Sequence, residues 1–267
     1  MTLIDIDPSA RGVLLVERVR AGRPLARRIG HGPAPTTWEP YDFAEACAEG
    51  VDLRGGDLRR ACLHRARLRG VVLRGAGKCF SAGHDLGDIA EGEEVPSRGW
   101  HSETLRLMEK LPKPVIAAVH GHCYTGALEV ALAADFIIAA DSARFGDTHS
   151  KWALTPIWGM SQRLPRRVGI ATAKRLMFSA DMFDAEEAVR IGLAEYSVPF
   201  EKFDVEIGSL AERIVANSGF SHAANKRLLE ATDNDALDAG LQWEVLENEG
   251  HGPDMNERIA AFMGKGK

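Results

Sequence analysis

The chain has 267 residues, of which 45% are hydrophobic, and a formal net charge of -5 at pH 7. This length suits one domain with an appendage or two small domains, and the acidic balance argues against a general nucleic-acid binder. No apolar run approaches the roughly 20 residues of a membrane span, the start lacks a secretory signal, and the four cysteines form no CxxC pair, so we expect a cytoplasmic protein with reduced thiols.

The N-terminal quarter shows weak patterns. Residues 12–16 have the composition of a strand, whereas residues 18–38 mix Arg, Gly, Pro and His without periodicity. Helical character is expected over 42–49 and over 57–69, where an apolar stripe ends at Gly70.

A second pattern overlaps the later part of that segment. Leucines recur every fifth residue, which resembles the pentapeptide repeats that build a square β-helix. These leucines are Leu53, Leu58, Leu63, Leu68 and Leu73. Five such units make little more than one coil, which does not bury its own core, so a helix leading into a strand over 70–74 is the favoured interpretation.

The expected strand runs into a glycine-punctuated turn, residues 75–86, that exposes backbone NH groups. The chain contains neither GxGxxG nor GxxxxGK[ST], which disfavours Rossmann and P-loop sites. A GxSxG nucleophile elbow is also missing from the sequence.

The next unit places a charge inside an apolar helix. We expect a strand over 115–119, a small-residue turn over 121–126 and then a helix in which every residue between Glu129 and Asp135 is apolar. A carboxylate is rare at such a position unless it is paired or functional. Gly126 lets a ligand reach NH groups at the positive end of the helix, which favours an oxyanion site.

The C-terminal third reads as helical. We expect helices over 179–191, with Asp184 as an N-cap, over 200–217, over 221–232, over 236–247 and over 253–263. Trp243 and Phe262 are expected to pack or to contact another subunit rather than bind a ligand. Lys226 is expected on a solvated face, with a phosphate contact as the alternative.

From about residue 70 onwards, the residues resemble the crotonase, or enoyl-CoA hydratase/isomerase, superfamily. The resemblance covers about residues 70 to 264. Its motifs are Phe80-Ser81-Ala82-Gly83-His84-Asp85-Leu86, Lys113 to Asp135, Ala143-Arg144-Phe145-Gly146-Asp147-Thr148-His149, Leu154-Thr155-Pro156 with Gly159, Gln162-Arg163-Leu164, Ala185-Glu186-Glu187-Ala188 with Gly192-Leu193, and Ala224-Asn225-Lys226-Arg227.

The resemblance implies an α/β fold. Its core would be a crotonase-like spiral of β-β-α turns in residues 1–199, with 1–69 divergent, because Arg23-Pro24-Leu25-Ala26-Arg27-Arg28 keeps only the opening of the family's first motif. Residues 200–267 would form a C-terminal helical region for oligomer contacts in a homotrimer or hexamer. The implied substrate is an acyl-CoA thioester, so coenzyme A is part of the substrate and no further cofactor or metal is expected.

The resemblance also implies site residues. The backbone NH groups of His84 and Gly126 would hold the thioester oxygen, and Ala82, His84, Asp85, Leu86, Gly87 and Gly126 would contact the CoA thioester. Two fixed NH donors stabilise the enolate that forms when a proton is removed beside a thioester or when water adds to its conjugated double bond.

One departure bears on the reaction. Hydratases of the family use two glutamates; Glu129 occupies the first position and His149 the second. Glu129 and His149 sharing the addition of water is the leading hypothesis, because imidazole exchanges protons near neutral pH. The alternatives are an isomerase using Glu129 alone, a β-diketone carbon-carbon hydrolase, ranked third because residues 154–160 hold no acid, and a non-catalytic acyl-CoA binder.

Overall fold

The structure is a computed structural model that describes residues 2–6, 16–17, 70–92, 97, 99–232 and 236–264. The helices expected over 42–49 and 57–69 lie outside the described residues. So does the strand expected over 12–16, apart from its last residue.

A six-stranded sheet forms the centre of the molecule, in the order β2-β1-β3-β4-β6-β9, and a smaller sheet has the order β5-β7-β8. The pairs β1–β2 and β7–β8 are antiparallel, and the other described pairs are parallel. The strands are β1 (Thr2–Ile6), β2 (Val16–Glu17), β3 (Val71–Gly75), β4 (Val115–Val119), β5 (His122–Tyr124), β6 (Phe136–Ala140), β7 (Arg144–Gly146), β8 (Phe183–Asp184) and β9 (Tyr196–Val198).

β4 shows why the large sheet is buried on both faces. All five of its residues are buried, and because side chains alternate along a strand they divide between two cores. Val115, Ala117 and Val119 join the core beneath α3 (Gly126–Leu132), whereas Ile116 and Ala118 join the core beneath α7 (Phe203–Val215). The predicted strand over 115–119 is confirmed.

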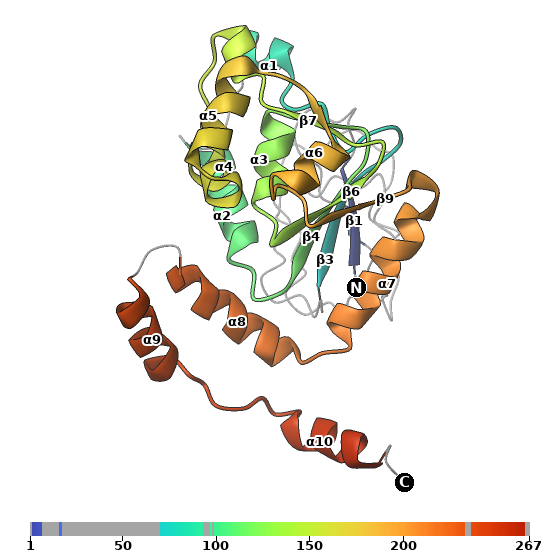
Figure 1. Cartoon of the computed structure of the whole chain (residues 1–267), viewed down its shortest axis with the longest axis vertical. Coiled ribbons are helices and arrows are strands. Elements are labelled where there is room, and N and C mark those ends of the chain that lie inside the picture. Colours follow the sequence, from blue (N-terminus) through green and yellow to red (C-terminus); the bar gives the residue numbers. More distant parts are fainter. Residues whose placement is uncertain are drawn as a thin grey trace, which may run out of the picture.

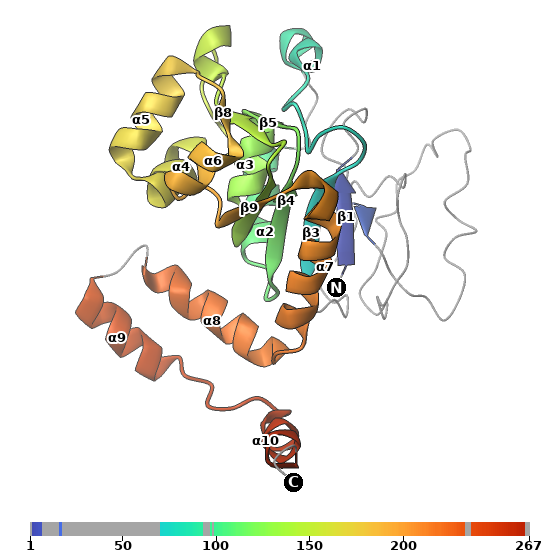
Figure 2. The ribbon, with the colours of Figure 1, turned by 45° about the vertical axis from the view of Figure 1, so that its right-hand side comes forward.

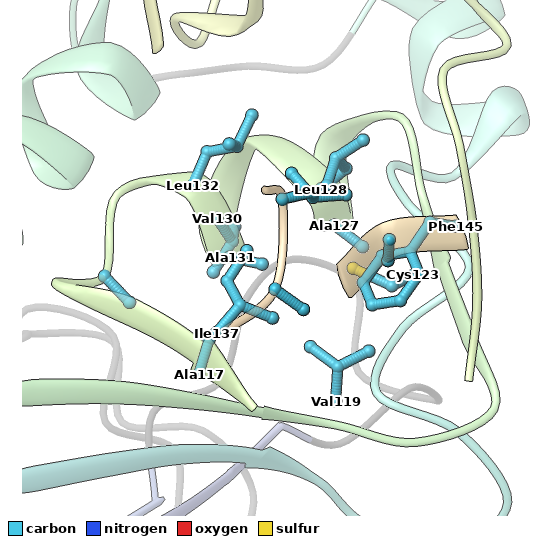
Figure 3. Packing of buried hydrophobic residues seen from close by; sticks show 14 of the residues in the cluster. Ala117, Val119, Cys123, Ala127, Leu128, Val130, Ala131, Leu132, Ile137 and Phe145 are labelled. Carbon is cyan, nitrogen blue, oxygen red and sulfur yellow. The ribbon is translucent and has the colours of Figure 1, made fainter. Parts of the chain in front are cut away.

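Helices cover the two faces of the sheet. α7 lies along one face (Figure 2), where Phe203 and Ile207 are buried against the strands. On the other face, the apolar side chains of α3 lie above Ile137 and Val119 (Figure 3). The remaining helices are α1 (Leu86–Glu91), α2 (Trp100–Glu109), η2 (His149–Trp152), α4 (Met160–Val168), α5 (Ile170–Ser179), α6 (Ala185–Arg190), η3 (Phe200–Lys202), α8 (Gly219–Thr232), α9 (Leu237–Leu246) and α10 (Met255–Gly264).

The helix predicted over 179–191 is only partly present. α5 ends at Ser179 and α6 begins at Ala185, because the segment between them contributes β8, which pairs with β7. The predicted N-cap is confirmed, since the carboxylate of Asp184 accepts a 2.9 Å hydrogen bond from the NH of Glu187.

The last three helices, α8 to α10, extend away from the sheet (Figure 1). α8 is tied back to it by Lys226, whose Nζ lies 2.9 Å from a carboxylate oxygen of Asp135 and 3.1 Å from the carbonyl oxygen of Lys113. The prediction that Lys226 lies on a solvated face is therefore wrong, because its ammonium group binds Asp135 and the backbone of Lys113. No helix in the described part of the chain is both long and apolar enough to cross a membrane. The division of the chain at residue 199 stays a prediction.

Candidate active site

The two glycine turns lie side by side. The NH of Phe80 donates to the carbonyl of His120 at 2.7 Å, and the NH of Ser81 donates to the carbonyl of His122 at 2.9 Å. Gly83 has a φ of +108°, and a β-carbon added there would lie 2.8 Å from the carbonyl oxygen of Tyr124 and 3.6 Å from the nitrogen of Gly126. A side chain at position 83 would therefore separate the turns that carry the two predicted NH donors.

The second turn is held in an unusual conformation. Thr125 has φ 51° and ψ -109°, which is uncommon for a β-branched residue. Its NH donates to the carbonyl of Gly146 at 2.9 Å, and its hydroxyl lies 2.6 Å from that of Thr148. Gly126 follows as the first residue of α3, and the first NH groups of a helix have no partner within it. The anchored Thr125 thus presents the positive end of α3 to the neighbouring space.

That space is a cavity of about 400 Å³. It contains both predicted donor residues and both predicted acid-base residues, and most of its other lining side chains are apolar. The lining residues are Ala82, His84, Leu86, Ile89, Tyr124, Thr125, Gly126, Glu129, Thr148, His149, Lys151, Trp152, Leu154, Thr155, Ile157, Trp158 and Met182.

Glu129 is 2% exposed, and one of its carboxylate oxygens is fixed by the backbone. Oε1 accepts hydrogen bonds of 2.9 Å from the NH groups of Trp158 and Met160. Between these residues, Gly159 has a φ of +117°, a conformation that L side chains rarely adopt. The backbone turn at Gly159 therefore directs two NH groups at one oxygen and leaves Oε2 for chemistry.

The surroundings of Glu129 act on its acidity in opposite directions. Burial raises the pKa of Glu129, whereas the NH of Met160, the charge of His149 and the NH of Trp158 lower it. Burial is the largest effect, so the pKa stays above its ordinary value. A carboxyl group with a raised pKa is suited to exchange a proton near neutral pH.

His149 is the first residue of η2 and lies close to Glu129. Its Nδ1 lies 2.6 Å from Oδ1 of Asp147, and its Nε2 lies 3.9 Å from Oε2 of Glu129. Burial lowers the pKa of His149, but the hydrogen bond with Asp147 and the charges of Asp147 and Glu129 outweigh it, so the pKa is raised. The structure thus brings together the two side chains that the sequence nominated as acid and base.

The predicted CoA-contacting turn divides into two parts. Ala82, His84 and Leu86 line the cavity together with Gly126. Asp85 instead caps α1, because its Oδ1 accepts a 2.7 Å hydrogen bond from the NH of Gly87, and both residues are exposed. A contact of Asp85 or Gly87 with the substrate stays a prediction.

Three site residues were missed by the sequence reasoning. Asp147 and Thr148 belong to the motif that ends at His149, but only the fold shows that Asp147 contacts His149 and that Thr148 contacts Thr125. Trp158 covers Gly126, and its ring stacks on His101 with centroids 4.5 Å apart. The signal that could have drawn attention to Asp147 is its spacing of two residues from a candidate catalytic histidine.

Solved structures share this architecture. An enoyl-CoA hydratase from Bacillus anthracis superposes with a TM-score of 0.69 and 36% identity, covering 75% of this chain and 80% of that one. Fold and site together define an enzyme of the crotonase class, as the motifs predicted.

A family model and sequence relatives lead to the same class of enzyme. The enoyl-CoA hydratase/isomerase family model matches residues 61–267. The crotonyl-CoA hydratase of Syntrophomonas wolfei is 34% identical over 207 residues, covering 74% of this chain and 78% of the relative. A probable enoyl-CoA hydratase of Rhodobacter capsulatus is 37% identical over 202 residues, covering 74% and 79%. The chain belongs to the enoyl-CoA hydratase/isomerase family.

A second family also matches. A model for pentapeptide repeats, in eight copies, matches residues 42–75. This match supports the five-residue leucine repeat and counts against the helix favoured over 57–69. Residues 71–75, at the end of the match, form β3 of the large sheet.

Proposed function

We propose that this protein is an enoyl-CoA hydratase in which Glu129 is the base and His149 is the acid. The observation that carries this proposal is the 3.9 Å separation of Oε2 of Glu129 and Nε2 of His149, two residues that line the cavity. An isomerase needs one proton shuttle, and a binder needs none. A second buried acid-base group beside the first therefore favours the addition of water.

The proton balance assigns the roles. Oε2 of Glu129 takes a proton from water as the water oxygen bonds to Cβ of the enoyl group, and the electrons of the double bond move to the thioester oxygen as an enolate. Cα then takes the proton from Nε2 of the protonated His149. Transfer of the gained proton from Glu129 to His149 restores the starting state. One proton on the Glu129–His149 pair is therefore required at the start of each turnover.

The two glycine turns would supply the oxyanion site. Enolate charge would develop on the thioester oxygen, where the NH groups of His84 and Gly126 would donate to it. Loss of one such donor typically raises a barrier by about 2.7 to 4 kcal/mol. The approach of the turns and the anchored backbone of Thr125 support this role.

The test is to incubate purified protein with a panel of enoyl-CoA and β-ketoacyl-CoA esters, separate the products by chromatography, which resolves isomers of equal mass, and analyse them by mass. We expect a gain of one water by an enoyl-CoA ester, and short chains are the first choice because a relative is named a crotonyl-CoA hydratase. A shifted double bond without water gain would instead identify an isomerase, and cleavage of a β-ketoacyl ester a hydrolase. No change in any ester would leave an acyl-CoA binder.

The C-terminal helices fit the predicted homotrimer or hexamer. α9 and α10 have no buried residue, and they expose large apolar side chains that water does not favour. Leu237 and Leu246 are both 78% exposed, and Phe262 is 80% exposed. Light scattering on the full chain tests this assembly, and a monomer at micromolar concentration would contradict it.

A further inference from the structure

Asp147 is a second buried carboxylate, and the proposed reaction gives it no direct role. It is 1% exposed and lies between β7 and η2. Its Oδ1 accepts from the backbone NH of His149 at 3.2 Å and lies 2.6 Å from Nδ1 of the same residue. Among the described residues, no donor reaches its buried Oδ2. A buried carboxylate with one oxygen unpartnered is unfavourable unless it has a charged partner or a task.

His149 is the partner that the geometry provides. The titratable groups that line the cavity with it are His84, Tyr124, Glu129 and Lys151. Glu129, from α3, approaches its Nε2 at 3.9 Å, which is longer than a hydrogen bond, whereas Asp147 contacts its Nδ1 directly. A carboxylate can only accept, so Nδ1 must carry a proton, and Nε2 is the ring atom left to face Glu129.

We infer that Asp147 is a positioning residue that fixes the tautomer and ring orientation of His149 and stabilises its protonated form for proton delivery. This inference rests on the proposed function. A short hydrogen bond between an imidazolium and a carboxylate is among the stronger polar contacts in proteins. His149 occupies the position at which hydratases of the family are expected to carry a second glutamate. It would work as an acid because the carboxylate of Asp147 stabilises its protonated form.

The first experiment needs no turnover. Histidine labelled with nitrogen-15 reports which ring nitrogen is protonated, and His149→Gln identifies the His149 signals among the nine histidines. At a pH where the ring is neutral, we expect the proton on Nδ1. A neutral ring with its proton on Nε2 would overturn the inference, because Asp147 would then have no proton to accept.

The second experiment uses Asp147→Asn, which keeps an oxygen acceptor near Nδ1 and removes the charge. The pKa of His149, followed by the same nitrogen signals, should fall by about one unit or more. The alkaline limb of kcat should move to lower pH by the same amount, with little change in KM. Asp181→Asn is the matched control. It makes the same chemical change at an exposed residue, and the backbone oxygen of Asp181 lies beside Gly146, the residue before Asp147.

The outcomes separate this inference from the proposed function. A uniform loss of kcat with an unmoved pH limb and an unmoved His149 titration would show that Asp147 only supports the fold, and it would overturn the inference. Wild-type protein that hydrates no ester would contradict the proposed function, and the nitrogen signals would still decide the role of Asp147. If Asp147→Asn does not fold, the wild-type tautomer decides.

Discussion

A β-carbon added at Gly126 would lie 2.8 Å from the indole ring of Trp158. Gly126→Ala must therefore displace either the ring or the start of α3, and both lie beside the predicted oxyanion site. We expect kcat for hydration to fall by about 100-fold, the typical effect of misplacing one donor. Steady-state kinetics measures this. Gly208→Ala in α7 is the control, because nothing lies within 4 Å of its added carbon, and it should leave kcat unchanged.

Glu129→Gln removes the base while keeping an oxygen that accepts from Trp158 and Met160. We expect the fold and the CoA affinity to be retained and turnover to fall by roughly 100-fold or more. Circular dichroism, calorimetric titration with a CoA ester and turnover assays measure the three properties. Unchanged turnover would remove Glu129 from the mechanism.

The same substitution should change how stability depends on pH. Burial raises the pKa of Glu129 above its ordinary value of 4.5, so folding favours the protonated form. The stability that this provides is complete below pH 4.5 and is lost as the pH rises through the folded-state pKa, at about 1.4 kcal/mol per unit of pKa shift. Glu129→Gln should therefore gain stability relative to wild type as the pH rises, measured by denaturant unfolding. A constant difference between the two proteins would contradict this.

His149 separates hydration from simpler proton exchange. His149→Ala should abolish hydration, because Cα receives no proton from Nε2, while Glu129-dependent exchange at the α or γ carbon continues in deuterated water. His149→Glu should recover hydration above the level of the Ala variant, since it restores a carboxyl acid. Mass analysis of products in deuterated water measures both reactions. Full hydration by His149→Ala would exclude the imidazole.

Local sequence patterns predicted the strand and the helix that position the carboxylate of Glu129. The strand over 115–119 and the glycine-led helix with Glu129 follow from apolar runs and one exceptional carboxylate. α2 and α4 were not anticipated, because each buries at most three residues and reads mostly as a polar segment. Sequence patterns predict elements best where burial is continuous.

Contacts between distant residues set the limit of prediction for the site. Glu129 and His149 were nominated from motif positions, but the NH groups that fix Glu129 come from residues 29 and 31 positions later. Lys226 shows the same limit, because its partner Asp135 lies 91 residues earlier. A spacing on the chain carries no information on such pairs without the fold.

Because Oε1 of Glu129 is held by the backbone, only Oε2 is available, and it lies 3.9 Å from Nε2 of His149. In the proposed reaction, the hydroxyl group and the new hydrogen would therefore reach the planar enoyl group from the same side. Addition would be syn, and hydration in deuterated water would give one stereoisomer at both carbons. The syn course of the addition would then follow from the two backbone hydrogen bonds that hold Oε1 and leave Oε2 to react.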